Sequence, residues 1–507
     1  MRNDKPAKRS AFETAGLKAT VAALIEEIKE MYLSDQLPWI VGYSGGKDST
    51  AALQLVWNAL SELRPEQRTK PIHVISTDTL VENPIVAAWV TQSLTAMRVA
   101  SETQNIPIQP NRLTPEIADT FWVNLIGRGY PAPRPKFRWC TDRLKIKPSN
   151  NFIVNVVRES GEAILVLGTR KAESSARSHA MEKLELRRVR DRLSPNASLP
   201  NCFVFSPIEE WSNDDVWLYL MQTKNPWGYN NKDLLTMYQG ASEDGECPLV
   251  VDTSTPSCGD SRFGCWVCTL VDQDKSMHAM IQNDEEKEWM LPLLKLRNEL
   301  DVHNDKHLRD FRRMNGSVQL FHNEPIHGPY KQDVREHWLR QVLEAQELIR
   351  ANGPEAVRTI ELISLAELCE IRRIWVVEKH EMEDSLPGIF KNITNKPFPG
   401  PSLDDNLVFG AEEMRLLKEI CGKDWLHFEL TRNLLDVERR YSSMARRAGL
   451  FEALEQSLRK GFYTDASDAT ARAQSREEEV RRIRAGESTL FSEELNLSAS
   501  SDETKKK

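Results

Sequence analysis

The sequence contains no run of about 18 apolar residues, the minimum length of a membrane-spanning helix. Its first ten residues are polar and charged, so they do not resemble a secretory signal. We therefore expect a soluble, cytoplasmic protein with no membrane partner.

Positive charge is not in surplus, because 67 Lys and Arg face 75 Asp and Glu, a formal net charge of −8. Overall charge therefore does not favour nucleic acid, and any polyanion site must be local. Eight cysteines in 507 residues are too few for a disulfide framework. A chain of this length is expected to form two or three domains.

The most informative stretch is residues 39–50, WIVGYSGGKDST. An apolar strand, a glycine turn and a helix follow one another, which directs backbone N–H groups and the positive end of a helix dipole toward one point. The spacing fits neither a Walker P-loop nor Gly-x-Gly-x-x-Gly. An ordinary strand–helix turn is the alternative. We expect a phosphate to be bound by Ser44, Gly45, Gly46, Lys47, Asp48 and Ser49.

Strands and helices alternate through the first 230 residues. Strands are predicted at 71–78, 106–108 and 163–168, and helices at 11–35 and 84–103. This alternation is typical of a parallel, doubly wound α/β sheet, in which ligands bind at the carboxyl ends of the strands. Ser44, Asp78 and Gly168 all fall at such ends.

A basic loop spans residues 128–148 and has a local net charge of +6. Its charged residues are Asp142 and the basic Arg128, Arg134, Lys136, Arg138, Arg143, Lys145 and Lys147. Such a loop can bind phosphates, and its Tyr130, Phe137 and Trp139 could stack on bases. A solvated loop is the alternative. Arg170, Lys171 and Arg177 follow the strand at 163–168 and could hold a second anion, although a structural helix start would look similar.

Four cysteines fall within 22 residues: Cys247, Cys258, Cys265 and Cys268. The last two form Cys-x-x-Cys, which can bind one metal or cluster from a single turn. We expect the ligands to be Cys140, Cys258, Cys265 and Cys268, with Cys247 as a substitute. Spacing does not separate an iron–sulfur cluster from zinc, and buried thiols without a ligand are a further alternative.

The rest of the chain indicates packing rather than chemistry. We expect an N-terminal helix (1–35), an α/β domain (36–230), a Cys-rich subdomain (231–330), a helical C-terminal region (331–464) and a disordered tail (465–507). Residues 280–315 look helical and highly charged. The tail is rich in Ala, Ser, Glu, Arg and Lys and has little to bury.

Together these motifs resemble the phosphoadenosine-phosphosulfate reductase family of pyrophosphate-loop proteins. The matching residues are Ser44 to Ser49, Asp78-Thr79, Cys140 with Lys145, and Gly168-x-Arg170-x-x-Glu173-Ser174-x-x-Arg177. The resemblance implies a Rossmann-like, adenine nucleotide α-hydrolase-like sheet. The chain departs from the reductases at Trp139-Cys140, where they have Cys-Cys, and it has no C-terminal catalytic cysteine of their kind. Sulfate reduction is therefore not the expected activity.

Longer segments are similar to the DndC family, the sulfurtransferases of bacterial DNA phosphorothioation, over most of residues 35–345. They are TDTLVENP (77–84), NLIGRGYP (124–131), RLSPNA (192–197) and FGCWVCT (263–269). This resemblance implies an ATP pyrophosphatase with a [4Fe–4S] cluster that replaces a non-bridging oxygen of a DNA phosphate by sulfur. It also implies a cysteine desulfurase as sulfur donor and DndD and DndE as partners.

The resemblance implies a role for each site residue. ATP would be bound by Ser44 to Ser49, Asp78 and Gly168, with Mg²⁺ near Asp48, and the catalytic residues would be Lys47, Asp48, Lys145, Arg170 and Arg177. Two alternatives remain: a sulfonucleotide reductase or tRNA sulfurtransferase, and a non-catalytic DNA-binding subunit gated by nucleotide.

Overall fold

The structure is a computed structural model that describes residues 10–241, 264–403, 410–442, 444 and 446–484. The chain divides into two compact units. Unit 1 comprises Met1–Asn124, Ala132–Val302 and Gln341–Glu367, and unit 2 comprises Leu125–Pro131, His303–Arg340 and Leu368–Lys507. The N-terminal helix, the α/β domain and most of the Cys-rich region, expected as three segments, thus belong to one unit.

Unit 1 is built on a six-stranded sheet in the order β3-β2-β1-β4-β6-β5. Neighbouring strands are parallel except β5, which is antiparallel to β6. In the register, Val41 lies opposite Val74 on one side and Val166 on the other. The predicted Rossmann-like parallel sheet is confirmed. The strands are β1 (Trp39–Gly42), β2 (Ile72–Thr77), β3 (Ile108–Leu113), β4 (Ala163–Val166), β5 (Ser194–Pro195) and β6 (Cys202–Phe205).

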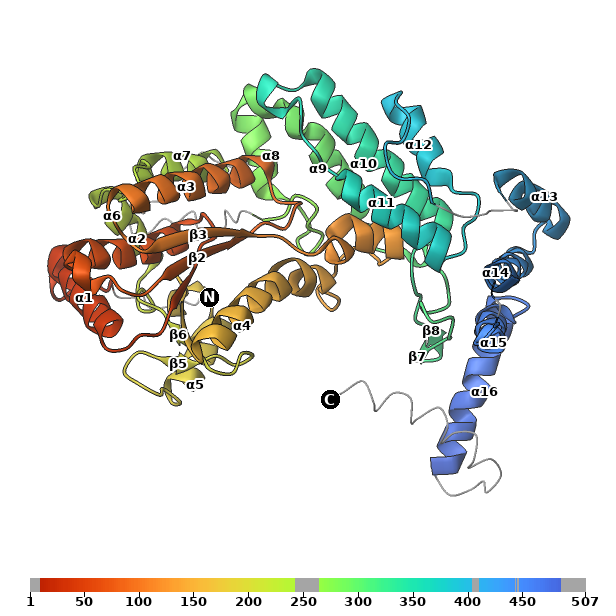
Figure 1. The fold of residues 1–507 in the computed structure, drawn as a ribbon, viewed down its shortest axis with the longest axis horizontal. Helices are drawn as coiled ribbons and strands as arrows, with labels where there is room; N and C mark the ends of the chain where they lie inside the picture. The colour runs from red at the N-terminus through yellow and green to blue at the C-terminus, as the bar shows by residue number, and fades with distance from the viewer. Residues whose placement is uncertain (1–9, 242–263, 404–409, 443, 445, 485–507) are drawn as a thin grey trace, which may run out of the picture. The chain divides into compact units, whose positions relative to one another are not determined.

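Helices cover both faces of this sheet (Figure 1). Trp39 and Val41 point into one apolar core with five helices, whereas Ile40 points into a second core with α4, as the two-residue period of a strand requires. The five helices are α1 (Gly16–Leu33), α2 (Lys47–Glu62), α3 (Pro84–Thr103), α6 (Asn213–Gln222) and α7 (Asn231–Gly240). Helix α4 spans Lys147–Ser160 and α5 spans Ser175–Glu185.

Two boundaries in unit 1 differ from the sequence expectation. Strand β3 runs from Ile108 to Leu113, beyond the predicted end at 108. The sequence predicts a charged helix over residues 280–315, but its last α-helix ends at Leu300. The helical structure up to that point consists of α8 (Lys275–Asn283), the 3₁₀ turn η6 (Glu285–Met290) and α9 (Leu291–Leu300). Asp and Asn side chains at 301, 304 and 305 favour turns over a helix interior, which accounts for the earlier end.

Unit 2 is helical, with one short hairpin of β7 (Leu320–Phe321) and β8 (Glu324–Pro325). Its helices are α10 (Gln332–Asn352, in unit 2 as far as Arg340), α11 (Leu365–Arg373, from Leu368), α12 (Ser385–Thr394), α13 (Ala411–Cys421), α14 (Trp425–Ser442), α15 (Leu450–Gly461) and α16 (Ala466–Arg484). Helix α16 lies where the sequence predicts a disordered tail, and the buried Ala469 and Ala473 supply its packed face. None of the helices that the structure describes has the length and apolar character needed to cross a membrane.

Candidate nucleotide and cysteine site

The phosphate loop lies between β1 and α2. Gly45 has φ +75°, and a Cβ there would lie 2.5 Å from Cγ2 of Val90, so only glycine fits the turn. Gly46 precedes the helix in an extended conformation, and no side chain caps the helix end. Hydroxyls order the loop from within, since Ser49 Oγ lies 3.1 Å from Ser44 Oγ and accepts from the Ser44 N–H at 3.2 Å. The loop thus presents a positive helix end suited to phosphate.

The end of β4 lies against the start of α2. A Cβ at Gly168 would lie 2.5 Å from the backbone oxygen of Asp48, so this approach requires glycine. Tyr238 of α7 supports the same turn, because its Oη accepts from the Lys47 N–H at 3.4 Å. Sequence reasoning missed Tyr238, which stands almost 200 residues from its partner in a helix without a motif.

Asp48 lies between two cations. Lys47 Nζ is 3.0 Å from Oδ2 of Asp48, and Arg170 Nε is 2.7 Å from its Oδ1. Arg170 is only 4% exposed and also donates from Nη1 to the carbonyl of Trp211 at 3.2 Å. The structure therefore brings Arg170 to the loop, but as a buried residue that positions Asp48.

Arg177 lies on the first turn of α5. Its side chain is 44% exposed and forms an ion pair with Glu173. The Glu173 carboxylate also accepts from the backbone N–H of Arg170 at 3.0 Å, which ties Arg177 to the end of β4. Arg177 has more freedom than Arg170 to reach an anion.

Asp78 follows β2, at the edge of the sheet where the phosphate loop follows β1. Arg112 of β3 forms an ion pair with Asp78, and the Leu80 N–H donates to Asp78 Oδ1 at 2.9 Å. Arg112 was missed because the predicted strand stopped at 108, before its charged end. Asp78 is thus a fixed acceptor whose orientation depends on Arg112.

The segment that carries Cys265 pairs with the chain that follows Asp78. Trp266 donates its N–H to the carbonyl of Val81 at 3.0 Å, and Asn83 donates to the carbonyl of Gly264 at 3.2 Å. Between them Glu82 and Cys265 form an antiparallel bridge. The hydroxyl of Thr79 lies 3.3 Å from Cys265 Sγ. This pairing fixes Cys265 near the end of β2.

Lys145 stands among the cysteines. It lies in η4 (Thr141–Ile146), a π-helical turn that begins directly after Cys140. The Cys265 thiolate raises the pKa of Lys145, with smaller contributions from Glu82, Cys268 and Cys140. Burial raises the pKa of Cys265 to about 11 and that of Glu82 to about 7, and Lys145 opposes both shifts. Cys265, Cys268 and Cys140 thus all lie close enough to Lys145 to interact with its charge, although Lys145 itself remains exposed to solvent.

Cys140, Cys265 and Cys268 are free thiols, and their sulfurs suit either an iron–sulfur cluster or a zinc ion. The other two candidates, Cys247 and Cys258, lie outside the described residues.

A buried arginine holds the turn after Cys268. Arg297 is 1% exposed and donates to the carbonyls of Cys268 at 2.9 Å and Asp272 at 3.0 Å. The Thr269 hydroxyl donates to the carbonyl of Pro133 at 2.6 Å, which joins the cysteine turn to the basic loop. Sequence reasoning missed Arg297, which looks like one more charge in a charged helix.

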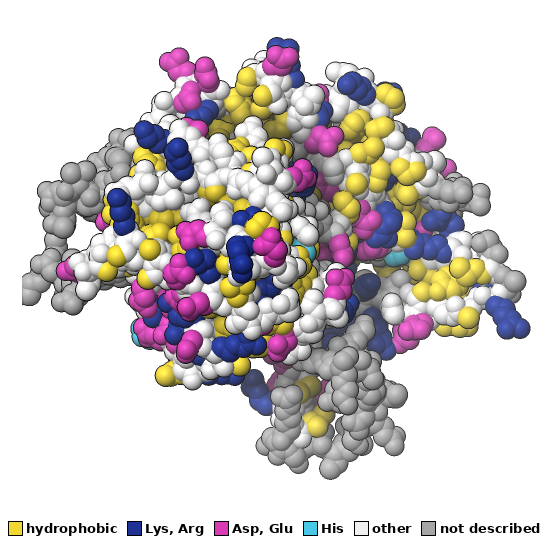
Figure 2. Space-filling view, turned by 60° about the vertical axis from the view of Figure 1, so that its left-hand side comes forward, with side chains coloured by type: hydrophobic (Ala, Val, Ile, Leu, Met, Phe, Trp, Pro, Cys, Tyr) yellow, Lys and Arg dark blue, Asp and Glu magenta, His cyan; other side chains and the backbone are white. Residues whose placement is uncertain are grey.

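Most cations of the basic loop are occupied. Asp119 forms ion pairs with Arg143, at 2.6 Å, and with Lys147. Arg134 donates to a backbone carbonyl at 2.9 Å, and Lys145 interacts with the cysteines. Trp139, expected as a base-stacking residue, is 7% exposed and stacks on Phe121 with centroids 5.4 Å apart. On the face drawn in Figure 2, Lys and Arg lie interspersed with Asp and Glu. Phe137, by contrast, is 46% exposed and lies between the exposed Lys136 and Arg138, so one part of the loop is built into the fold and another part is open to solvent.

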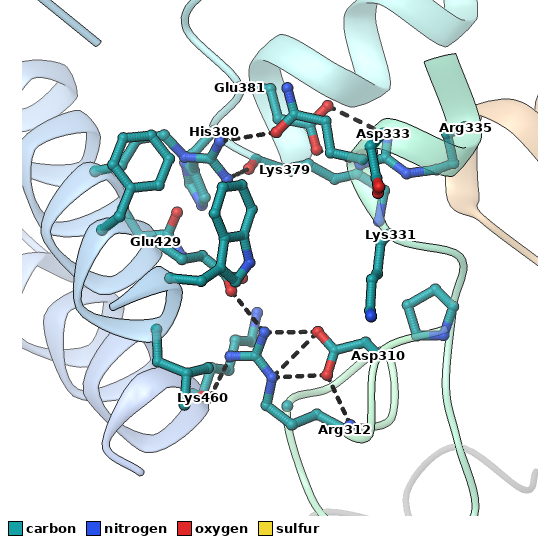
Figure 3. A pocket seen from close by; sticks show the side chains of 18 of the residues that line it. Asp310, Arg312, Lys331, Asp333, Arg335, Lys379, His380, Glu381, Glu429 and Lys460 are labelled. Atoms are coloured by element: carbon teal, nitrogen blue, oxygen red, sulfur yellow. Dashed lines mark hydrogen bonds and ion pairs between the residues drawn. The ribbon is translucent and has the colours of Figure 1, made fainter. Parts of the chain in front are cut away.

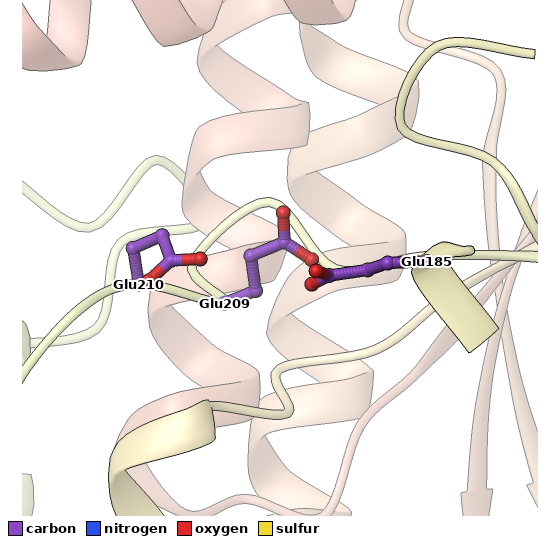
Figure 4. Close-up of side chains that lie close together, drawn as sticks. All are labelled: Glu185, Glu209 and Glu210. Carbon is purple, nitrogen blue, oxygen red and sulfur yellow. The ribbon is translucent and has the colours of Figure 1, made fainter. Parts of the chain in front are cut away.

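Three carboxylates gather elsewhere in unit 1, on Glu185, Glu209 and Glu210 (Figure 4). Lys171 lies 2.7 Å from Glu185 and also pairs with Glu210, while Arg188 lies 3.0 Å from Glu209. These ion pairs account for the cluster without a metal ion.

Comparison with known proteins agrees with this geometry. Residues 38–270 match the phosphoadenosine phosphosulfate reductase domain family. An uncharacterized protein of Methanocaldococcus jannaschii is 28% identical over 200 residues, which are 39% of this chain. The chain spans only 35% of that relative's length. Residues 38–270, the range that matches the family model, contain the phosphate loop and the three described cysteines of the site.

Two solved structures share 14% identity with the chain. An FMN adenylyltransferase of Candida glabrata, in complex with FAD and inorganic pyrophosphate, has a TM-score of 0.25 over 47% of this chain and 66% of its own. The U34-tRNA thiolase NcsA of Methanococcus maripaludis, with its [4Fe-4S] cluster, has a TM-score of 0.27 over 57% of this chain and 82% of its own. TM-scores this low do not bear on the function of this chain.

Proposed function

We propose that this protein is an ATP-dependent sulfurtransferase that activates a phosphate of DNA and replaces one of its non-bridging oxygens with sulfur. One observation carries the sulfurtransferase part. A glycine turn that opens helix α2 follows β1, and Cys265 pairs with the chain after the adjacent parallel strand β2, where Lys145 interacts with it. Both lie at the carboxyl edge of the sheet, where such folds bind ligands.

The loop would bind ATP. The N–H groups of residues 44–49 and the α2 dipole would hold the β and γ phosphates, which leave as pyrophosphate. Lys47 would neutralise negative charge on the pyrophosphate. Asp48 would contact Mg²⁺ through one of its two carboxylate oxygens, which also form ion pairs with Lys47 and Arg170. Asp78, fixed by Arg112, is a candidate acceptor for the nucleoside.

Activation and transfer would proceed in two steps. A phosphate oxygen of the acceptor attacks the α-phosphorus of ATP, which breaks the bond to pyrophosphate and leaves the acceptor adenylated. Sulfide then attacks the acceptor phosphorus, and the oxygen departs with AMP. Lys145 and Arg177 would offset the negative charge that develops at the attacked phosphorus.

The cysteines would hold a [4Fe–4S] cluster. Cys140, Cys265 and Cys268 would be three ligands, and Cys258, or Cys247, the fourth. When bound, such a cluster supplies iron that binds sulfide. Lys145 would lower the cost of ionising Cys265 when a ligand binds, because its ammonium partly offsets the rise in the pKa of Cys265 that burial causes.

The choice of DNA rests on the resemblance of residues 77–84, 124–131, 192–197 and 263–269 to the DndC family. That proposal includes a cysteine desulfurase as sulfur donor and DndD and DndE as partners. The second candidate is a sulfonucleotide reductase, the activity named in the description of the family model that matches residues 38–270, or a tRNA sulfurtransferase.

The test is mass spectrometry of nuclease-digested DNA from the host strain. Phosphorothioate dinucleotides are expected in the wild type and absent from Lys47→Ala and Cys265→Ser strains. Cys421→Ser, in the last turn of α13, is the matched control and should keep them. Phosphorothioate retained in the Lys47→Ala strain would refute the proposal. Loss of a thiolated tRNA base in its place would establish the second candidate.

A further inference from the structure

Unit 2 contains a cavity of about 1410 Å³, formed by residues 310–316 and 329–336, the turn at 374–383 and helices α13 to α15 (Figure 3). Pockets that enclose one small molecule are usually about 300–1,000 Å³. The space is therefore large enough for a ligand that extends beyond a single nucleotide.

Carboxylates in this cavity are largely engaged by arginines. Arg312 lies 2.6 Å from both Asp310 and Glu429, and Arg335 forms an ion pair with Glu381, as the dashed lines in Figure 3 show. Two further acids cap helices, since Asp424 accepts the His427 N–H and Asp465 accepts the Ser467 N–H. These negative charges are held by the fold.

The lysines of the cavity are not matched in this way. Lys379, Lys418, Lys423 and Lys460 line it, and none has a carboxylate partner among the ion pairs of the described residues. Lys331 donates to a backbone carbonyl at 2.8 Å, which leaves its charge uncompensated, and in Figure 3 it extends into the open space. Eleven Lys and Arg line the cavity against nine Asp and Glu, so its net charge is about +2, and the lysines carry the part of the positive charge that is not held in ion pairs.

These lysines come from separate elements. Lys418 lies on α13, Lys423 in the turn after it and Lys460 on α15, while Lys331 precedes α10. A single phosphate is bound by donors that converge on one point, as in the loop of unit 1. Charges spread along a cavity instead suit a chain of phosphates.

An aromatic ring stands among these charges. Trp425, the first residue of α14, lines the cavity and is 42% exposed. Phe428 supports its ring at a centroid distance of 5.2 Å, and Lys418 Nζ lies 5.7 Å from its centroid. An exposed ring beside lysines is the arrangement on which unpaired bases stack while the backbone phosphates are neutralised.

We propose that this cavity binds a single strand of nucleic acid, with phosphates on the lysines and a base on Trp425. The inference does not depend on ATP hydrolysis in unit 1. It adds a strand-binding surface that the DNA-modifying function would use, and it can be tested by binding alone.

The test is fluorescence anisotropy with a labelled single-stranded DNA oligonucleotide and the full chain at several salt concentrations. The variant is K418Q/K423Q, two exposed lining lysines. It should bind several-fold more weakly, and its salt slope should fall by about 1.4, since each phosphate contact contributes about 0.7. The control, K391Q/K396Q, loses the same charge from exposed positions of unit 2 outside the cavity and should match the wild type.

A second variant tests stacking. W425A should lower affinity roughly 10-fold, and W425F should recover most of it. Equal effects of the two lysine pairs, or wild-type binding by all variants, would overturn the proposal, as would a preference for duplex DNA or for free AMP. Equal binding of an RNA of the same sequence would support a site that does not read the sugar. Lys47→Ala should bind normally, so a failure here is separate from a failure of the sulfurtransferase proposal.

Discussion

Arg170 Nε lies 2.7 Å from Asp48 Oδ1, and this contact joins the segment after β4 to the first turn of α2. The guanidinium is almost fully buried, while the Asp48 side chain is 25% exposed toward the phosphate loop. The pair therefore fixes a carboxylate at the site with a cation that solvent does not reach.

Replacing Arg170 by alanine should destabilise unit 1. It removes the partner of Asp48 and leaves the carbonyl of Trp211 without its donor. Breaking a buried ion pair from one side costs about 3 kcal/mol of unfolding free energy, to be measured by urea denaturation. Arg177→Ala removes only a partly exposed pair and should cost less than about 1 kcal/mol. Equal losses would mean that burial of Arg170 has no energetic role.

The strand–turn–helix of residues 39–50 was predictable because all its determinants lie within twelve residues. An apolar strand, a glycine turn and helix formers each follow from local preferences, and β1 and α2 bear them out. Arg112, Tyr238 and Arg297 were not predictable, since each acts on a partner that only the fold brings near. The basic loop shows the same limit in part: Lys136, Phe137 and Arg138 are exposed as its composition indicated, whereas Asp119 pairs with Arg143 and Lys147.

Gly168→Ala should weaken ATP binding. The new methyl group would lie 2.5 Å from the Asp48 carbonyl, so α2 or the β4 end must shift, and the N–H groups that we propose bind phosphate would move with it. A displacement near 1 Å at such a site lowers activity by about 100-fold, and we expect affinity to fall at least about 10-fold. Calorimetry with ATP measures the effect. Gly240→Ala is the control, because nothing lies within 4 Å of a Cβ there, and it should bind as the wild type does.

The cysteine assignment predicts metal content. Anaerobically purified wild-type protein should contain about four iron and four sulfide per chain, as a [4Fe–4S] cluster requires. Cys140→Ser, Cys265→Ser and Cys268→Ser should each lose most of both, because each removes a ligand. Cys421→Ser should lose none.

The same assay decides the remaining alternatives. One zinc per chain in place of iron would contradict the cluster and establish structural zinc. Comparison of Cys258→Ser with Cys247→Ser identifies the fourth ligand, since only the ligating cysteine should affect iron content. Wild-type iron in all five variants would show that the cluster is held elsewhere.

Lys379 gives unit 2 a distinct pH dependence. Burial, with a contribution from Arg335, lowers the pKa of Lys379 from 10.5 to about 8. Below pH 8 this lysine is charged in both states, so folding carries the full cost of burying the charge. Between pH 8 and 10.5 the unfolded chain binds more protons than the folded one, and stability rises with pH.

Lys379→Met should therefore stabilise the protein at pH 7, and its advantage should shrink as pH rises toward 10. The gain at pH 7 is about 1 to 3 kcal/mol, since one pKa unit corresponds to about 1.4 kcal/mol and the side chain is only partly shielded from water. Urea unfolding at pH 7, 8.5 and 10 measures the difference. The exposed Lys423→Met controls for loss of charge and should show no such trend. A constant difference between wild type and Lys379→Met across this range would mean that Lys379 keeps its ordinary pKa in the folded protein.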